Sequence, residues 1–215
     1  MLKAVLFDFD GTLADTYDII HFAFQGIYKE FLDKTVTKQD IVALFGPPED
    51  IIIEKEFKTH GDIKPILKHY YDLYHQHHPA YSQPQPEMRD LLKLLKKQNK
   101  KIGIITGKGN KSLQISLRHL FPDITFDVTI AGDQVELPKP DPEGLQMALQ
   151  VLNCMPNEAV FIGDSDFDIH AGKAIGMHTI GVTWFDPERE FQFSEKPDVL
   201  LHTVADLKNY LLKRM

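Results

Sequence analysis

The chain has little cysteine, no excess of positive charge and no long apolar run. Its 215 residues include one cysteine, Cys154, so no disulfide can form within the chain, which is typical of a reducing compartment. The formal net charge is −7, so we expect no nucleic-acid partner. The first apolar run is interrupted by Asp8, too early for a signal peptide or a membrane span, and no later run reaches that length. We therefore expect a soluble, cytoplasmic protein without a membrane partner.

Short apolar segments alternate with helical patterns along most of the chain. Segments rich in β-branched residues and bounded by Gly, Asp or Pro are typical of buried strands, and they occur at 3–8, 101–106, 127–132, 159–164 and 178–183. Helical patterns such as "PEMRDLLKLLKKQ" (86–98) lie between them. This alternation predicts an α/β fold, a doubly wound parallel sheet with a Rossmann-like core.

One interval is much longer than a crossover between parallel strands needs. About ninety residues separate the first two expected strands, whereas a crossover takes roughly a dozen. The interval contains helical patterns at 16–31, 37–45, 48–57 and 62–78 and no strand pattern. We therefore expect two domains, with an inserted all-helical cap at 15–85 and an α/β core formed by 1–14 and 86–215.

Polar residues follow the expected strands where ligands bind in parallel α/β sheets, beyond the carboxyl ends. Carboxylates that meet at one edge repel each other unless a cation neutralises them, and an all-oxygen set of ligands suits Mg²⁺. The residues that follow the first four strands are Asp8, Asp10, Gly11 and Thr12, then Thr106, Gly107 and Lys108, then Lys139 and Asp141, and finally Asp164, Asp166 and Asp168.

These groups are the parts needed to hold and transfer a phosphoryl group. Backbone amides around Gly11 and Gly107 could donate to phosphoryl oxygens. One carboxylate can attack phosphorus to form an aspartyl-phosphate, and a second, two residues further along the strand, can exchange a proton with the leaving oxygen and the attacking water. A lysine and Mg²⁺ would offset the charge on the phosphoryl oxygens.

Four motifs in this order resemble those of the haloacid dehalogenase superfamily. They are "DFDGT" (8–12), Thr106 after the second strand, Lys139 between two prolines, and "GDSDFD" (163–168). The helical insert is similar to the C1-type cap of the phosphoglycolate-phosphatase-like branch. The resemblance implies that Asp8 is the nucleophile and Asp10 the general acid/base. It also implies that Asp8, the backbone carbonyl of Asp10 and Asp164 hold Mg²⁺.

The resemblance further implies which residues surround this centre. Thr106 and Lys139 would bind the phosphoryl group, beside the backbone amides already expected around Gly11 and Gly107, and Asp168 would support the metal site indirectly. One position departs from the pattern, because many relatives have "TN" after the second strand where this chain has "TG" at 106–107. The amide is retained there, but a side-chain contact is lost.

The favoured function is therefore a Mg²⁺-dependent phosphatase acting on a small phosphorylated metabolite. A sugar phosphomutase or a pyrophosphatase could use the same core, and a dehalogenase fits Asp10 less well. A phospho-acceptor signalling module is of another class, and it would carry its phosphorylated Asp after the third strand, where this chain has Lys139, and would lack the ninety-residue insert. An inactive binding protein on the same fold is a further alternative, and the complete set of acids argues against it. The sequence leaves open the substrate and whether the protein is a monomer or a homodimer.

Other features have simpler interpretations. The histidines in "HQHH" (75–78) fit the polar end of a cap helix better than a metal site, and Asp166 fits a solvent-facing helix start. The segment "FGPPED" (45–50) is a turn into a helix that could also face the site and influence substrate choice. Trp184 and Arg189 follow the fifth expected strand, near the mouth of the predicted site.

Overall fold

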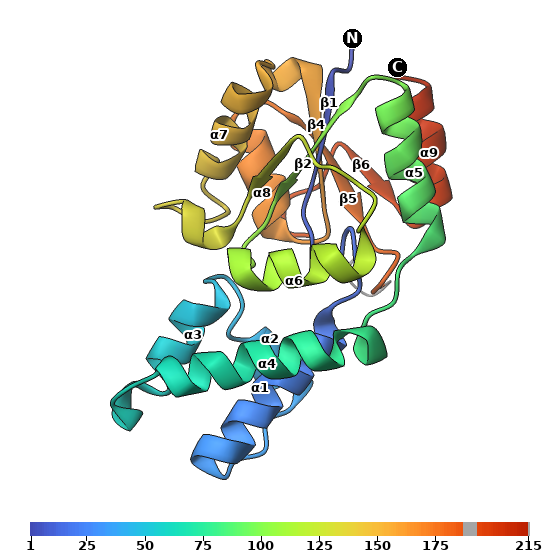
Figure 1. Cartoon of the computed structure of the whole chain (residues 1–215). Helices are drawn as coiled ribbons and strands as arrows, with labels where there is room; N and C mark the ends of the chain where they lie inside the picture. The colour runs from blue at the N-terminus through green and yellow to red at the C-terminus, as the bar shows by residue number, and fades with distance from the viewer. Residues whose placement is uncertain (187–192, 215) are drawn as a thin grey trace.

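A six-stranded parallel sheet forms the centre of the larger part of the protein (Figure 1). The computed structural model describes residues 1–186 and 193–214. The strand order is β3-β2-β1-β4-β5-β6. The first strand, β1, therefore lies inside the sheet, with β2 on one side and β4 on the other. The strands are β1 (Ala4–Phe7), β2 (Lys101–Ile105), β3 (Val128–Ile130), β4 (Ala159–Gly163), β5 (His178–Val182) and β6 (Val199–Leu201).

Both faces of this sheet are buried beneath helices, as the apolar strands predict. In β1, Val5 and Phe7 belong to the apolar cluster on one face, and Ala4 and Leu6 belong to the cluster on the other. The first face is covered by α5 (Pro86–Lys97), α6 (Asn110–Leu120) and α9 (Val204–Leu212). The second is covered by α7 (Glu143–Leu152) and α8 (Asp166–Ala174). The predicted doubly wound fold is confirmed.

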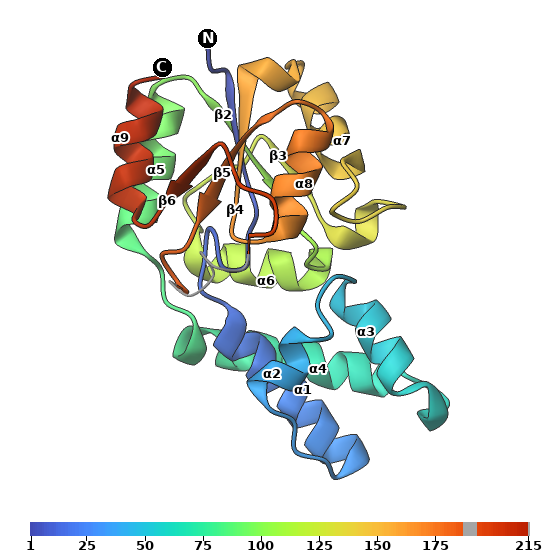
Figure 2. The same ribbon diagram turned by 180° about the vertical axis from the view of Figure 1, so that it is seen from behind.

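The first four α-helices after β1, which we call the cap helices, pack around an apolar cluster of their own. They lie beyond the carboxyl ends of the strands, on the far side of α6 from the sheet (Figures 1 and 2). Ile115 of α6 joins their cluster, so α6 packs against both parts of the protein. The cap helices are α1 (Tyr17–Leu32), α2 (Lys38–Val42), α3 (Glu49–Glu56) and α4 (Lys64–Tyr81). The domain boundaries at 15 and 85 stay a prediction.

The two chain segments that lead to and from the cap helices are bonded to each other. The hydroxyl of Ser82, directly after α4, donates to the backbone carbonyl of Asp15, two residues before α1, at 2.6 Å. Ser82 is buried, although it lies in the proline-rich segment that the sequence suggested as a linker.

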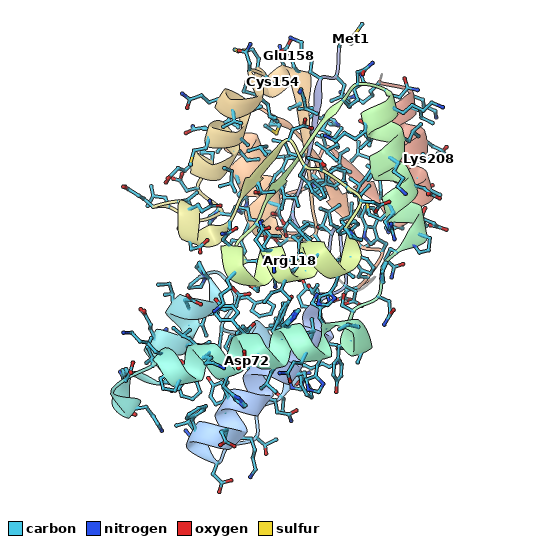
Figure 3. All side chains as sticks on the ribbon, viewed as in Figure 1. Met1, Asp72, Arg118, Cys154, Glu158 and Lys208 are labelled. Atoms are coloured by element: carbon cyan, nitrogen blue, oxygen red, sulfur yellow. The ribbon has the colours of Figure 1, made fainter. Side chains whose placement is uncertain are left out.

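The far end of the sheet carries no part of the candidate site. Cys154 and Glu158 lie at the end of the sheet away from the cap helices, and Asp72 marks the cap (Figure 3). Cys154, at this far end, is a free and partly exposed thiol. Within residues 1–186 and 193–214, no helix is both long enough and apolar enough to cross a membrane.

Candidate active site

The candidate site lies where β1 and β4 run side by side at the centre of the sheet. The backbone amide of Asp8 donates to the carbonyl of Ile162 at 2.8 Å, so the hydrogen-bond ladder between the strands continues one residue beyond β1. From β1 the sheet is built in one direction through β2 and β3 and in the other direction through β4, β5 and β6. Ligands of doubly wound sheets bind where the strand order reverses in this way. The fold therefore fixes the backbone of Asp8 at the binding edge.

Three buried carboxylates and one lysine meet at this edge. Carboxylate oxygens of Asp8, Asp164 and Asp168 lie within 4.8 Å of one another. The ammonium of Lys139 lies 2.9 Å from Asp8 Oδ1 and 2.6 Å from Asp168 Oδ1, and it also donates to the backbone carbonyl of Ile105 at 3.3 Å. Residues up to 160 positions apart in the chain thus meet, as the sequence predicted.

This cluster perturbs the protonation of its own members. Burial raises the pKa of Asp8 to about 8; Lys139 opposes that rise, and Asp168 and Asp164 add to it. Burial alone would lower the pKa of Lys139, but Asp168 and Asp8 together hold it above its ordinary value. The cluster therefore carries more negative charge than one lysine compensates, and a further cation would stabilise its ionised form.

The donor set of this cluster fits a divalent cation. Hard cations prefer carboxylate and carbonyl oxygens, and three buried carboxylates within reach of one another provide them. Asp8 and Asp164 were expected as ligands, whereas Asp168 was expected to act indirectly. Asp168 is fully buried within the cluster, with its Oδ1 paired to Lys139, and its indirect role stays a prediction.

Two glycines allow these acids to approach the backbone closely. Gly11 has a φ of 80°, and a Cβ there would lie 2.2 Å from Asp164 Oδ2. At Gly163 a Cβ would lie 2.3 Å from the carboxyl carbon of Asp168. The Gly11 amide donates to the carbonyl of Ala14 at 2.8 Å, so a phosphoryl group would compete with Ala14 for this donor.

Asp10 lies at the boundary between the sheet and the cap helices. Its Oδ1 accepts a hydrogen bond from the hydroxyl of Thr16, the residue before α1. It also lies 3.1 Å from the ammonium of Lys108, a residue whose side chain is fully buried. Asp10 therefore does not join the cluster of Asp8, Asp164 and Asp168; its carboxylate faces the cap instead.

Lys108 connects Asp10 with an acid from the cap. Its ammonium lies 3.4 Å from Glu49 Oε1, and Glu49 begins α3. Burial alone would lower the pKa of Lys108, but Asp10, Tyr74 and Glu49 hold it above its ordinary value. The Glu49 carboxylate also accepts from the amide of Gly109 at 2.7 Å and from the hydroxyl of Ser112. A buried acid of the cap is thus bound by the first turn of α6.

The predicted phosphate-binding residues Thr106 and Gly107 follow β2 beside this contact. Thr106 is buried, and its hydroxyl accepts from the amide of Lys108 at 3.2 Å. A Cβ on Gly107 would lie 3.3 Å from the carbonyl of Gly46 in the cap. The missing side chain at 107 therefore lets the cap segment 46–49 lie close to the end of β2.

The sequence missed the pairing of Lys108 with Glu49. Both lie in segments that had drawn attention, since Lys108 follows Thr106 and Gly107 and Glu49 belongs to "FGPPED". Glu49 and Lys108 are 59 positions apart, and they meet only because the cap docks on the core in this orientation. No local sequence pattern predicts that orientation. Tyr17 was also missed, and its hydroxyl donates to Asp164 Oδ2 at 3.0 Å.

The structure changes how three polar or aromatic residues outside the predicted site are interpreted. Asp166 is not merely solvent-facing, since it accepts hydrogen bonds from the amide and hydroxyl of Ser194. His78 is no polar helix end: it is fully buried and lies 2.9 Å from the Ser116 hydroxyl of α6. The indole of Trp184 donates to the carbonyl of Thr12 at 2.9 Å. Arg189 lies outside the described residues.

A cavity of about 430 Å³ opens between the sheet edge and the cap helices. Its inner end is formed by Asp8, Asp10, Thr106, Lys139 and Asp164. Its volume falls in the range of roughly 300–1,000 Å³ that is usual for small-molecule sites. The cavity can hold a small ligand that reaches from the acids and lysines to the cap.

Comparison with known proteins agrees with this geometry. The family model described as haloacid dehalogenase-like hydrolase matches residues 5–182. Pyrophosphatase PpaX of Bacillus cereus is 32% identical over 206 residues, which cover 96% of this chain and 94% of that protein. The crystal structure of CbbY from Rhodobacter sphaeroides in complex with phosphate has a TM-score of 0.81 and 25% identity, with 96% of each chain covered. That of a predicted phosphoglycolate phosphatase from Haemophilus somnus has a TM-score of 0.78 and 20% identity, with 98% of each covered, and shows the shared fold.

Fold and site thus define an α/β hydrolytic enzyme with an acidic centre at the edge of a parallel sheet and a helical cap above it. The chain belongs to the haloacid dehalogenase-like hydrolases. The family match favours an enzyme over the phospho-acceptor signalling module that the sequence had left open.

Proposed function

We propose that this protein is a Mg²⁺-dependent phosphatase that hydrolyses a small phosphorylated metabolite through an aspartyl-phosphate. The observation that carries the proposal is the position of Asp8, held at a strand end between Lys139 and the acids Asp164 and Asp168. A carboxylate in this position can attack phosphorus while the lysine offsets the charge of the phosphoryl oxygens.

The proposed reaction has two steps. In the first, an Asp8 oxygen forms a bond to phosphorus, the bond between phosphorus and the leaving oxygen breaks, and Asp10 gives its proton to that oxygen. In the second, Asp10 takes a proton from water, the water oxygen bonds to phosphorus, and the bond to Asp8 breaks. Inorganic phosphate leaves and Asp8 is restored. Thr106, Gly107 and Lys139 would hold the phosphoryl group in both steps, together with Gly11 if its amide is released from Ala14.

Mg²⁺ would be held by Asp8, Asp164 and the backbone carbonyl of Asp10, with Asp168 beside them. When bound, the ion would neutralise the crowded carboxylates and the phosphoryl oxygens. The cap helices would exclude water during the first step and admit it when they open. A cytoplasmic setting and a monomeric or homodimeric state stay predictions.

The first test is Asp8→Asn, assayed by phosphate release from acetyl phosphate and aryl phosphates with and without Mg²⁺. We expect turnover to fall by at least about 10⁴-fold because an amide is a far poorer nucleophile than a carboxylate. The matched control is Asp123→Asn, which removes an acid paired with Arg89 and Lys93 on the surface. Wild-type turnover by Asp8→Asn would exclude the proposed nucleophile.

A pyrophosphatase is the second candidate, and the similarity to the PpaX proteins favours it. Pyrophosphate could be attacked by the same Asp8, with the second phosphate as leaving group. Comparing kcat/KM for pyrophosphate and for phosphomonoesters under the same Mg²⁺ concentration separates the two candidates.

A further inference from the structure

The outer half of the cavity differs in chemistry from its inner end. The cap contributes mostly apolar side chains to the wall, namely Tyr17, Ile20, Phe24, Val42, Phe45 and Ile52. Phe167 and Phe193 line the same cavity from the core, and Phe167 is 46% exposed despite its apolar ring. A ligand that extends outward from the phosphoryl position therefore meets hydrocarbon.

The wall offers no spare positive charge among the residues that the structure describes. Its two lysines are already paired, Lys108 with Asp10 and Glu49, and Lys139 with Asp8 and Asp168. The five acids that line the cavity are Asp8, Asp10, Glu49, Asp164 and Asp166. With Asp10 protonated, as the first step requires, and a divalent cation bound, the four other acids balance the ion and the two lysines. No cation among the described lining residues is then left to bind a second anionic group on the substrate, which would lose its hydration without compensation.

The described part of the cap wall also has few free hydrogen-bonding groups for a leaving group rich in hydroxyls. Its polar side chains are Tyr17 and Glu49. The Tyr17 hydroxyl donates to Asp164, and the Glu49 carboxylate is occupied by Gly109, Ser112 and Lys108. Hydroxyls placed against this wall would lose their hydrogen bonds to water without replacement.

Aromatic rings provide the most specific feature of the wall. The rings of Tyr17 and Phe45 are stacked, with centroids 6.0 Å apart and planes inclined by 21°. A flat apolar group that enters the cavity can extend this stack and bury its own surface and that of Phe45.

From these observations we infer that the leaving group of the substrate is uncharged and apolar, with an aryl group as the best fit. The substrate class is thus phosphomonoesters of apolar or aromatic alcohols, in preference to pyrophosphate, carboxylate-bearing phosphates such as phosphoglycolate, or sugar phosphates. The inference rests on the proposed phosphatase function, and it assigns Phe45 and Val42 as specificity-determining residues.

The test compares substrates that differ in one charge. Wild-type kcat/KM is measured with Mg²⁺ for phenyl phosphate, 4-carboxyphenyl phosphate, pyrophosphate and acetyl phosphate. The para-carboxylate of 4-carboxyphenyl phosphate makes its phenol a slightly better leaving group than that of phenyl phosphate. If the enzyme nevertheless prefers phenyl phosphate, the preference reports binding to the cavity wall and not intrinsic reactivity. We expect phenyl phosphate to exceed both 4-carboxyphenyl phosphate and pyrophosphate by at least about tenfold.

A charge introduced into the wall provides the second arm. Val42→Lys places an ammonium at a half-exposed position that lines the cavity. We expect it to raise the ratio of kcat/KM for 4-carboxyphenyl phosphate over phenyl phosphate by about threefold or more. Val42→Met controls for side-chain length. Ile51→Lys adds the same charge at a half-exposed cap position that does not line the cavity, and it should leave the ratio unchanged.

The outcomes separate this inference from the proposed function. No phosphate release from acetyl phosphate or from either aryl ester would overturn both. Hydrolysis of acetyl phosphate together with equal or faster hydrolysis of pyrophosphate or 4-carboxyphenyl phosphate would keep the phosphatase and overturn the apolar leaving group. An unchanged ratio in Val42→Lys would remove Val42 from the specificity-determining wall.

Discussion

Replacement of Lys108 by methionine removes the only cation that the described structure places against Glu49. The ammonium of Lys108 lies 3.4 Å from Glu49 Oε1 and 3.1 Å from Asp10 Oδ1, and its own side chain is fully buried. With an effective dielectric constant of about 20, each contact is worth about 5 kcal/mol before desolvation is subtracted. Methionine fills most of the space but leaves Glu49 buried and uncompensated.

We expect Lys108→Met to lower the free energy of unfolding by about 3 kcal/mol, at the low end of the range for broken buried pairs, because Asp10 is partly exposed. Urea unfolding measures this loss. Hydrogen exchange of the Gly109 amide, which donates to Glu49, reports separately on whether the cap contact has opened. The double variant Lys108→Met/Glu49→Gln should be less destabilised than the sum of the single variants, by about 1–3 kcal/mol.

The matched control is Lys111→Met, three residues further along the chain in the first turn of α6. Lys111 is exposed and lies 3.9 Å above the Tyr71 ring of the cap, so its replacement should cost less than about 1 kcal/mol. The reasoning is refuted if Lys108→Met costs no more than this control, or if the effects of the two changes at 108 and 49 simply add.

Three further predictions concern strain, pH and metal. Gly11→Ala should destabilise by about 1–3 kcal/mol more than Gly61→Ala in urea unfolding, because both glycines have positive φ but only a Cβ at Gly11 collides with Asp164. Burial, together with the nearby His119 and Lys108, lowers the pKa of His78 from 6.5 to about 3. At a pH between about 3 and 6.5, the unfolded chain therefore binds a proton at His78 that the folded protein does not bind. The wild type should therefore lose about 2–3 kcal/mol more than His78→Gln when the pH falls from 7 to 4.5, measured as unfolding free energies, and equal losses would contradict a neutral buried imidazole. Addition of Mg²⁺ should raise the Tm of the wild type and of Asp123→Asn but not of Asp164→Asn; an equal rise in all three would place the ion elsewhere.

Most of the sheet could be predicted from the sequence because its strands are buried on both faces. Residues 102–105 and 159–163 are continuously apolar, and the residues directly after them are a hydroxyl, a glycine and an acid. The order of these segments sufficed to bring Asp8, Lys139 and Asp164 to one edge, since the carboxyl ends of parallel strands coincide.

The elements near the C-terminus had weaker signals. β6 has three residues, all only partly buried, and it pairs with β5 at the edge of the sheet. A strand this short and half-exposed lacks the apolar run that identified the others. The helix Val204–Leu212 that follows it covers the same face as α5, and it was likewise not predicted.

The contacts between cap and core could not be predicted for a different reason. Glu49 and His78 are polar residues in amphipathic segments, and the sequence pattern places such residues in solvent. Both are buried because the cap docks on α6, where Gly109, Ser112 and Ser116 provide partners. Where two separately packed parts of a protein dock through polar residues, the hydrophobic periodicity of their sequences does not reveal the contact.

The bond between Ser82 and Asp15 restricts how the cap helices can move. Two separate tethers would let the cap tilt and twist in several directions. Because the hydroxyl of Ser82 donates to the carbonyl of Asp15, any movement that separates the outgoing from the returning segment must break this hydrogen bond. A displacement of the cap that keeps the two segments together leaves this bond intact, so it costs less than one that pulls them apart.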